Sequence, residues 1–153
     1  MSETQSPRKS AVVVEGVTPI LAVRSLPASI DYYVSVLGFQ VDWHQPGIMA
    51  SVSRDRCGIF LCEGDQGNPG TWVWIGVEDT ELLFEDYRIK GAKVRHPPTN
   101  YPWAYEMQIE DPDGHVLRFG SEPKTDRPCG EWLDMRGDLW VMPASGDWTR
   151  ANS

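Results

Sequence analysis

Residues 18–39, TPILAVRSLPASIDYYVSVLGF, decide the fold of this chain. Residues 18–24 suit a strand, Ser25 has the side chain of a helix N-cap, and Pro27 fits the first helical turn. Apolar side chains then recur at helical spacing, at Ile30, Tyr33, Val34 and Leu37. Gly38 follows, and glycine is the residue that most easily ends a helix. The stretch therefore predicts a strand followed by a helix with one apolar stripe.

The same order of elements occurs twice. After the glycine-rich residues 64–70 a strand and a helix return, with Asp79 as N-cap and Gly91 at the helix end. The strand that restarts the pattern is expected at residues 71–77. The remaining strands are expected at residues 39–43, 48–53 and 57–63 in the first half, and at residues 93–96, 105–110 and 115–120 in the second.

The sequence therefore predicts one α+β domain built from two βαβββ modules, residues 17–64 and 71–122. A module this small cannot bury its own sheet, so the two modules are expected to pack together. Residues 1–16 are polar at their start and are expected to form a flexible arm. Residues 123–153 form a tail that is too aromatic to be freely solvated, so we expect it to pack on the body or on a partner subunit.

Composition excludes several classes of protein. The chain has 153 residues and a net charge of −8, which argues against a nucleic-acid partner because phosphate binding needs a basic face. No apolar run approaches the roughly 20 residues that span a bilayer, so no membrane partner is expected. The three cysteines form no CxxC pair, which suits free thiols in a reducing compartment. These features predict a cytoplasmic protein.

Three segments resemble the vicinal oxygen chelate superfamily of glyoxalases, extradiol dioxygenases and bleomycin-resistance proteins. They are residues 18–39, residues 71–94, and residues 105–120 with the DPDG turn followed by His-Val-Leu. The resemblance implies paired βαβββ modules whose curled mixed sheets form a cleft, often in a homodimer. Open sheet edges and the aromatic tail also favour a homodimer, because symmetric pairing would cover both.

The resemblance also implies where a metal would be bound. Metal enzymes of the superfamily place ligands at three positions that match Thr18, Trp72 and Arg118 here. None of these is a usual ligand for a divalent metal, and an arginine would repel the ion. We therefore expect no metal and no cofactor.

Strand alternation predicts which side chains face the cleft. Trp72 and Trp74 share one face of their strand, and Glu106 and Arg118 face the same side from theirs. Aromatic faces bind flat or cationic molecules, although tryptophans can equally fill the space between sheets or a dimer seam. The predicted ligand-binding residues are Trp43, Trp72, Trp74, Trp103, Glu106 and Arg118.

These features leave three interpretations of function. The first is a non-catalytic protein that sequesters an aromatic or cationic, antibiotic-like small molecule, as in the bleomycin-resistance branch. The second is a metal-free or atypical enzyme that draws on His44, Glu63 and Glu106. The third is a dimeric domain with no ligand of its own. His44 and His96 are expected in exposed loops, and Glu106 with Arg118 in an ion pair.

Overall fold

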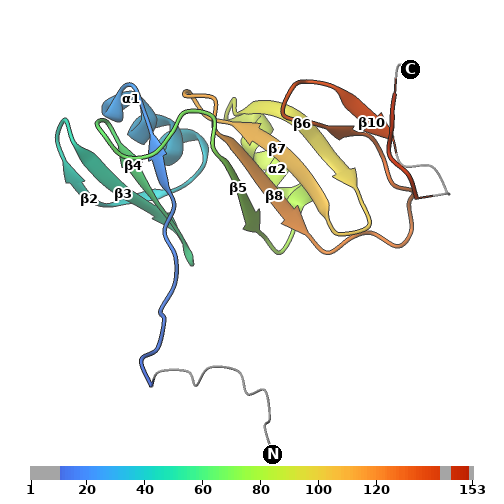
Figure 1. Ribbon diagram of the computed structural model, residues 1–153, viewed down its shortest axis with the longest axis horizontal. Coiled ribbons are helices and arrows are strands. Elements are labelled where there is room, and N and C mark those ends of the chain that lie inside the picture. Colours follow the sequence, from blue (N-terminus) through green and yellow to red (C-terminus); the bar gives the residue numbers. More distant parts are fainter. Residues whose placement is uncertain (1–10, 142–145, 152–153) are drawn as a thin grey trace, which may run out of the picture.

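The computed structural model of the chain describes residues 11–141 and 146–151. The first ten residues of the predicted arm, and residues 142–145 and 152–153 of the predicted tail, lie outside the described residues. Residues 11–18 are exposed and extend away from the body (Figure 1).

The first module contains one mixed sheet and one helix. Ser25 caps α1 (Leu26–Asp31) by accepting a hydrogen bond from the Ala28 amide at 3.3 Å. The helix continues as the π-helical η1 (Tyr32–Val36), and Gly38 then takes a φ of +79°. The strands run in the order β1-β4-β3-β2, with β1 parallel to β4. They are β1 (Ile20–Ala22), β2 (Gln40–Gln45), β3 (Met49–Arg54) and β4 (Cys57–Cys62).

The second module repeats this topology. Asp79 caps α2 (Thr80–Ile89), and the sheet has the order β5-β8-β7-β6 with β5 parallel to β8. We call it sheet 2, and the sheet of the first module sheet 1. The strands of sheet 2 are β5 (Trp72–Gly76), β6 (Lys93–Asn100), β7 (Tyr105–Glu110) and β8 (Val116–Ser121). The predicted α+β class with two βαβββ modules is therefore confirmed.

The two modules share one hydrophobic core. Buried side chains of the first module, such as Leu37 and Leu61, belong to the same cluster as Met107 and Leu117 of the second. Two tyrosines at matching helix positions bind across the junction. The Tyr33 hydroxyl donates to Asp111 Oδ2 at 2.8 Å, and the Tyr87 hydroxyl donates to the Leu37 carbonyl at 2.7 Å. The sheets lie side by side and are not closed into a barrel (Figure 1).

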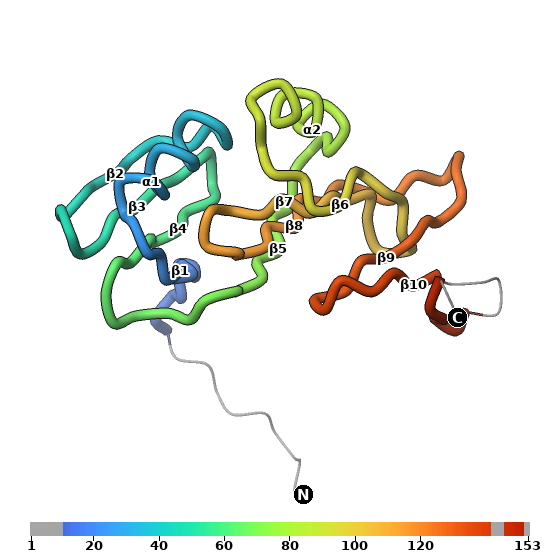
Figure 2. Tube along the Cα trace, turned by 90° about the horizontal axis from the view of Figure 1, so that it is seen from above, coloured from blue at the N-terminus to red at the C-terminus, as the bar shows by residue number. Residues whose placement is uncertain are grey.

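The tail forms a third, small sheet. Its strands are β9 (Trp132–Leu133), β10 (Leu139–Val141) and β11 (Thr149–Arg150), in the order β11-β10-β9. Figure 2 shows α2 on one side of sheet 2 and β9 with β10 on the other. No helix within the described part of the chain is long and apolar enough to cross a membrane.

The predicted loop positions of two histidines are wrong. His44 lies in β2, and His96 lies in β6, which continues through Pro97 and Pro98 to Asn100. The prolines are tolerated because β6 is an edge strand and its pairing shifts register between His96 and Thr99.

His115 connects the modules. Its amide donates to Asp111 Oδ1 at 2.9 Å, which is the local contact expected after the turn. The buried ring also accepts from the Thr71 amide at 2.9 Å and lies 2.6 Å from the Ala22 carbonyl. The ring therefore ties β1 to the start of β5, a link that local sequence does not reveal.

Candidate ligand-binding site

The candidate site is the face of sheet 2 that lies opposite α2. Along β7 and β8 the alternate residues Met107, Ile109, Leu117 and Phe119 enter the core under the helices. Their neighbours point to the other face, as the alternation predicted. Backbone pairing places Trp74 opposite Arg118, and Gln108 opposite Arg118 on its other side.

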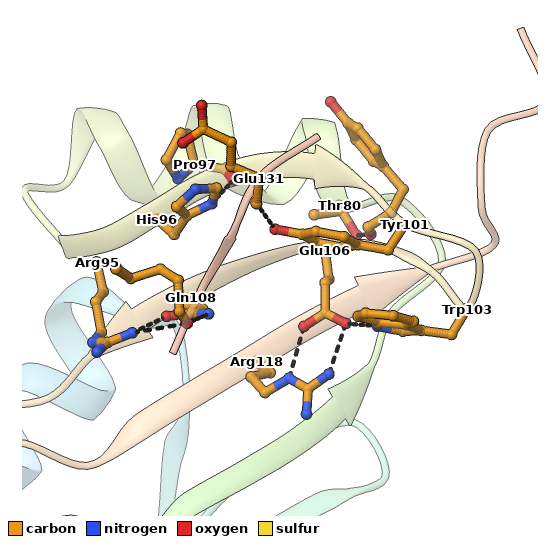
Figure 3. Close-up of polar contacts among 12 residues, drawn as sticks. Thr80, Arg95, His96, Pro97, Tyr101, Trp103, Glu106, Gln108, Arg118 and Glu131 are labelled. Carbon is orange, nitrogen blue, oxygen red and sulfur yellow. Dashed lines mark hydrogen bonds and ion pairs between the residues drawn. The ribbon is translucent and has the colours of Figure 1, made fainter. Parts of the chain in front are cut away.

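An ion pair lies at the centre of this face. The Arg118 guanidinium donates to both carboxylate oxygens of Glu106, at 2.8 and 2.9 Å, and the Trp103 indole N–H donates to Oε1 (Figure 3). The Glu106 side chain is 1% exposed and the Arg118 side chain 25%. The ion pair considered from the sequence is therefore present. Because Glu106 is buried and already accepts three hydrogen bonds, this carboxylate has little capacity left for a ligand.

Two glycines create a flat seat for Trp74. Gly76 and Gly120 are paired across β5 and β8. A Cβ at Gly120 would lie 2.8 Å from Trp74 Cζ2, and one at Gly76 would lie 3.2 Å from Trp74 Cζ3. The indole thus lies against both glycines: a side chain at Gly120 would clash with it, and one at Gly76 would be in tight contact. Trp74 remains 50% exposed, so the ring offers a supported aromatic surface to solvent.

Trp132 completes the aromatic part of the site. Its ring centroid lies 6.3 Å from that of Trp72 and 5.9 Å from that of Trp103. The Arg118 guanidinium carbon lies 4.8 Å from the centre of the Trp132 ring. The tail therefore brings together three predicted site residues through a residue that sequence reasoning had placed only in the tail. Two apolar-aromatic clusters in the tail were the one available signal.

Burial shifts the pKa of two groups at the tail side of this face. Burial raises the pKa of the Tyr101 hydroxyl well above its usual value, so this group keeps its proton and donates to the Glu131 carbonyl. Burial also lowers the pKa of His96, which favours a neutral imidazole. Its Nδ1 lies 3.3 Å from the Thr99 hydroxyl. The Tyr101 hydroxyl is therefore a hydrogen-bond donor that the tail occupies.

Trp43 lies apart from the other predicted site residues. It belongs to β2, the outer strand of sheet 1, where its ring contacts Phe60 at 5.3 Å. The residues considered for an atypical enzyme are also dispersed. His44 lies on the same outer strand, whereas Glu63 accepts a hydrogen bond from the Leu26 amide at 2.6 Å and so caps α1.

The three positions implied for metal binding do not fit a divalent ion. Thr18 is exposed ahead of β1, Trp72 contacts Trp132, and Arg118 is a cation paired with Glu106. Across residues 11–141 and 146–151, no three His, Cys, Asp or Glu side chains form a group that could hold a metal. The donors at this face are therefore unsuited to metal coordination.

Several solved structures share this architecture. The TioX protein of Micromonospora sp. ML1 is 20% identical with a TM-score of 0.63, and the match covers 71% of this chain and 99% of TioX. The bleomycin-binding protein of bleomycin-producing Streptomyces verticillus, complexed with copper(II)-bleomycin, is 22% identical with a TM-score of 0.62, covering 74% and 99%. Lactoylglutathione lyase of Agrobacterium tumefaciens is 18% identical with a TM-score of 0.60, covering 71% and 95%.

At these identities the likeness supports the fold alone. No curated protein matches the sequence. The sequence model of the Glyoxalase/Bleomycin resistance protein/Dioxygenase superfamily, however, matches residues 13–119, which include the first module and all but the last three residues of the second. The chain therefore belongs to the Glyoxalase/Bleomycin resistance protein/Dioxygenase superfamily.

Proposed function

We propose that this protein binds a small planar aromatic molecule on the exposed face of sheet 2 and holds it without transforming it. The observation that carries the proposal is Trp74, whose indole is seated against Gly76 and Gly120 and remains 50% exposed. A supported aromatic ring loses little conformational freedom when a ligand stacks on it. Stacking of this kind contributes about 0.5–1.5 kcal/mol beyond the burial of apolar area.

The charges on this face favour a ligand with acceptor atoms over a cationic one. Glu106 is buried and already accepts three hydrogen bonds from Arg118 and Trp103. A ligand cation would therefore find no free carboxylate here. Arg118 keeps a quarter of its side chain exposed, and its guanidinium can meet a carbonyl or carboxylate of the ligand.

Sequestration is favoured over catalysis by the arrangement of the polar groups. His44 lies in β2 of sheet 1, Glu63 follows β4 and is used to cap α1, and Glu106 is neutralised by Arg118. A general acid or base must come within hydrogen-bond reach of the reacting group, and these three residues do not share a site. The bleomycin-binding protein with the same fold gives a precedent for ligand binding by this architecture.

A fluorescence titration tests the proposal. Planar antibiotics, including metal-free bleomycin, are titrated against the native chain, Trp74→Ala, and the matched control Trp43→Ala. We expect Trp74→Ala to weaken binding at least about fivefold, equivalent to about 1 kcal/mol, and Trp43→Ala to leave it unchanged. Equal binding by all three proteins would place the site elsewhere. Chromatography of the recovered compound checks the claim that the ligand is not transformed, because any chemical conversion would contradict it.

We also propose that the protein is a homodimer. Within the described residues β5 pairs only with β8, so its other edge is open. A groove of about 1410 Å³ follows this edge and is lined by apolar and charged residues of both modules, among them Phe39, Arg54, Ile59 and Trp74. A second copy would cover this open edge and leave Trp74 lining the space between the two copies. Light scattering coupled to size exclusion decides, because a monomer mass at tens of micromolar would contradict the proposal.

A further inference from the structure

A short piece of the tail lies on the proposed ligand face. We call residues 130–134 the covering segment. Its backbone is fixed at the start, where the Gly130 amide donates to the Asn100 carbonyl at 2.9 Å. Gly130 is required for this approach, because a Cβ there would lie 2.5 Å from Thr99 Cγ2. The segment therefore follows the surface of sheet 2 closely from its first residue.

Side chains of sheet 2 and of the adjoining loop hold the covering segment by its carbonyl groups. Gln108 Nε2 donates to the Leu133 carbonyl at 3.0 Å, and Arg95 Nη2 donates to the Asp134 carbonyl at 2.6 Å. The Tyr101 hydroxyl donates to the Glu131 carbonyl (Figure 3). Between these contacts the Trp132 ring packs beside Trp72 and over Arg118. The segment thus contributes an aromatic ring flanked by acceptor oxygens. The face contributes hydrogen-bond donors for these oxygens and aromatic rings beside Trp132.

This contact differs from a permanent core contact. No residue of the covering segment belongs to the hydrophobic core that joins the two modules. Beneath the segment lie Gln108 and the pair of Glu106 and Arg118, which are polar groups that water can satisfy once the segment leaves. Uncovering this face leaves no buried polar group unpaired, and it frees the rings of Trp72, Tyr101 and Trp103, which Trp132 contacts, for the ring of a ligand.

The covering segment can also leave without unfolding. Its β9 pairs with β10 in the third sheet and with no strand of sheets 1 and 2. The hairpin is closed internally, because Trp140 Nε1 donates to Asp134 Oδ2 at 2.8 Å. The chain just before it stays attached, since the Asn100 side chain donates to the carbonyls of Lys124 and Arg127. The hairpin can therefore lift as a unit about the residues between Arg127 and Gly130.

We infer that the covering segment is an intramolecular competitor: it occupies the ligand face until a ligand of similar chemistry displaces it. The ligand class follows from the contacts: an aromatic ring over Arg118, with flanking amide carbonyls for Gln108, Arg95 and Tyr101. The inference rests on the proposed function and adds a regulation to the same site. Trp74 stays open in both states, so a ligand can first stack there and then replace Trp132.

A peptide that copies the segment tests the inference on the full-length chain. The probe is a fluorescein-labelled Glu-Trp-Leu-Asp peptide with blocked ends, and the readout is fluorescence anisotropy. A tethered segment competes at an effective concentration in the millimolar range, so the native chain should bind the probe weakly. Trp132→Ala should bind it about tenfold more tightly or better. Met135→Ala, an exposed residue of the same hairpin, is the matched control and should behave as the native chain.

Equal affinity for the three proteins, or no binding to Trp132→Ala, would overturn the inference. Hydrogen exchange on the native chain gives a second readout that does not depend on the variants. Excess unlabelled peptide should speed the exchange of the Gly130 amide, and unchanged exchange would count against displacement. If the peptide experiments show no effect while Trp74→Ala still weakens antibiotic binding, only this inference is refuted. If the peptide displaces the covering segment but Trp74→Ala does not change antibiotic binding, only the proposed function is refuted.

Discussion

Gly120→Ala is the most informative single substitution for this protein, because it alters the seat of Trp74 without changing any polar group. The new methyl carbon would lie 2.8 Å from Trp74 Cζ2 and 3.2 Å from the Cβ of Glu106. Carbon atoms in ordinary contact are about 3.5 Å apart or more, so the indole has to move by at least about 0.7 Å. Trp74 is half-exposed and can swing outward, whereas the Glu106 backbone in the centre of the sheet cannot.

The loss of stability in Gly120→Ala depends on how freely Trp74 can move away from the new methyl group. Overpacked sites usually lose about 1–3 kcal/mol, and the freedom of Trp74 places Gly120→Ala near the lower end. Gly58→Ala is the matched control, because Gly58 also lies inside a strand and a Cβ there would meet no atom within 4 Å. That change should be neutral or should raise the free energy of unfolding by up to about 1 kcal/mol, since alanine restricts the unfolded chain.

Two measurements check this reasoning. Urea denaturation gives the free energy of unfolding of both variants, and the fluorescence titration with planar antibiotics gives their affinity. Gly120→Ala should lose stability and weaken binding, because the displaced indole no longer lies flat against the sheet. Gly58→Ala should keep both properties. If the two variants behave alike in both measurements, the seat formed by Gly76 and Gly120 has no role in binding.

Three further predictions follow from single contacts. Arg118→Met leaves the buried Glu106 without its counter-ion and should lower the free energy of unfolding by about 3 kcal/mol in urea; a loss under about 1 kcal/mol, typical of a surface pair, would contradict this. Burial lowers the pKa of His96, so the unfolded chain binds its proton more tightly, and stability should rise with pH up to about 6.5. His96→Gln should flatten this rise, and equal slopes would refute it. The exposed Cys129 should react with dithiobis(nitrobenzoate) many-fold faster than Cys57, whose pKa burial raises, and equal rates would show a different fold around them.

The module architecture could be predicted because its signals are local. Ser25 and Asp79 both cap helices through their side chains, at the positions that the sequence suggested. Strand alternation also assigned the two faces of β7 and β8 correctly, since side-chain direction in a strand depends only on position parity. For the same reason Met107 and Leu117, which alternate with Glu106 and Arg118 along these strands, lie in the core.

The composition of the site could not be predicted to the same degree, because its contacts span long distances in sequence. Trp132 meets Trp72 from 60 positions away, and no periodicity in either segment encodes that contact. Trp43 is also a tryptophan in a strand, as Trp72 and Trp74 are, yet its strand is the outer edge of the other sheet. Gly120 carried a usable signal, since a glycine inside a strand often marks a close approach of another group, here the Trp74 ring.

The central ion pair supports the proposal that this face holds a molecule without transforming it. Arg118 lies where the family resemblance implies a metal ligand on the last strand, and its charge is fixed to the chain. A guanidinium offers directional hydrogen bonds but no open coordination position, so it cannot activate water or polarise a bound oxygen as a metal does. Glu106 cancels most of its field at short range. What remains on the face is a neutral, donor-bearing centre between the rings of Trp74 and Trp132, and under the proposed function such a surface would select ligands by shape and acceptor position.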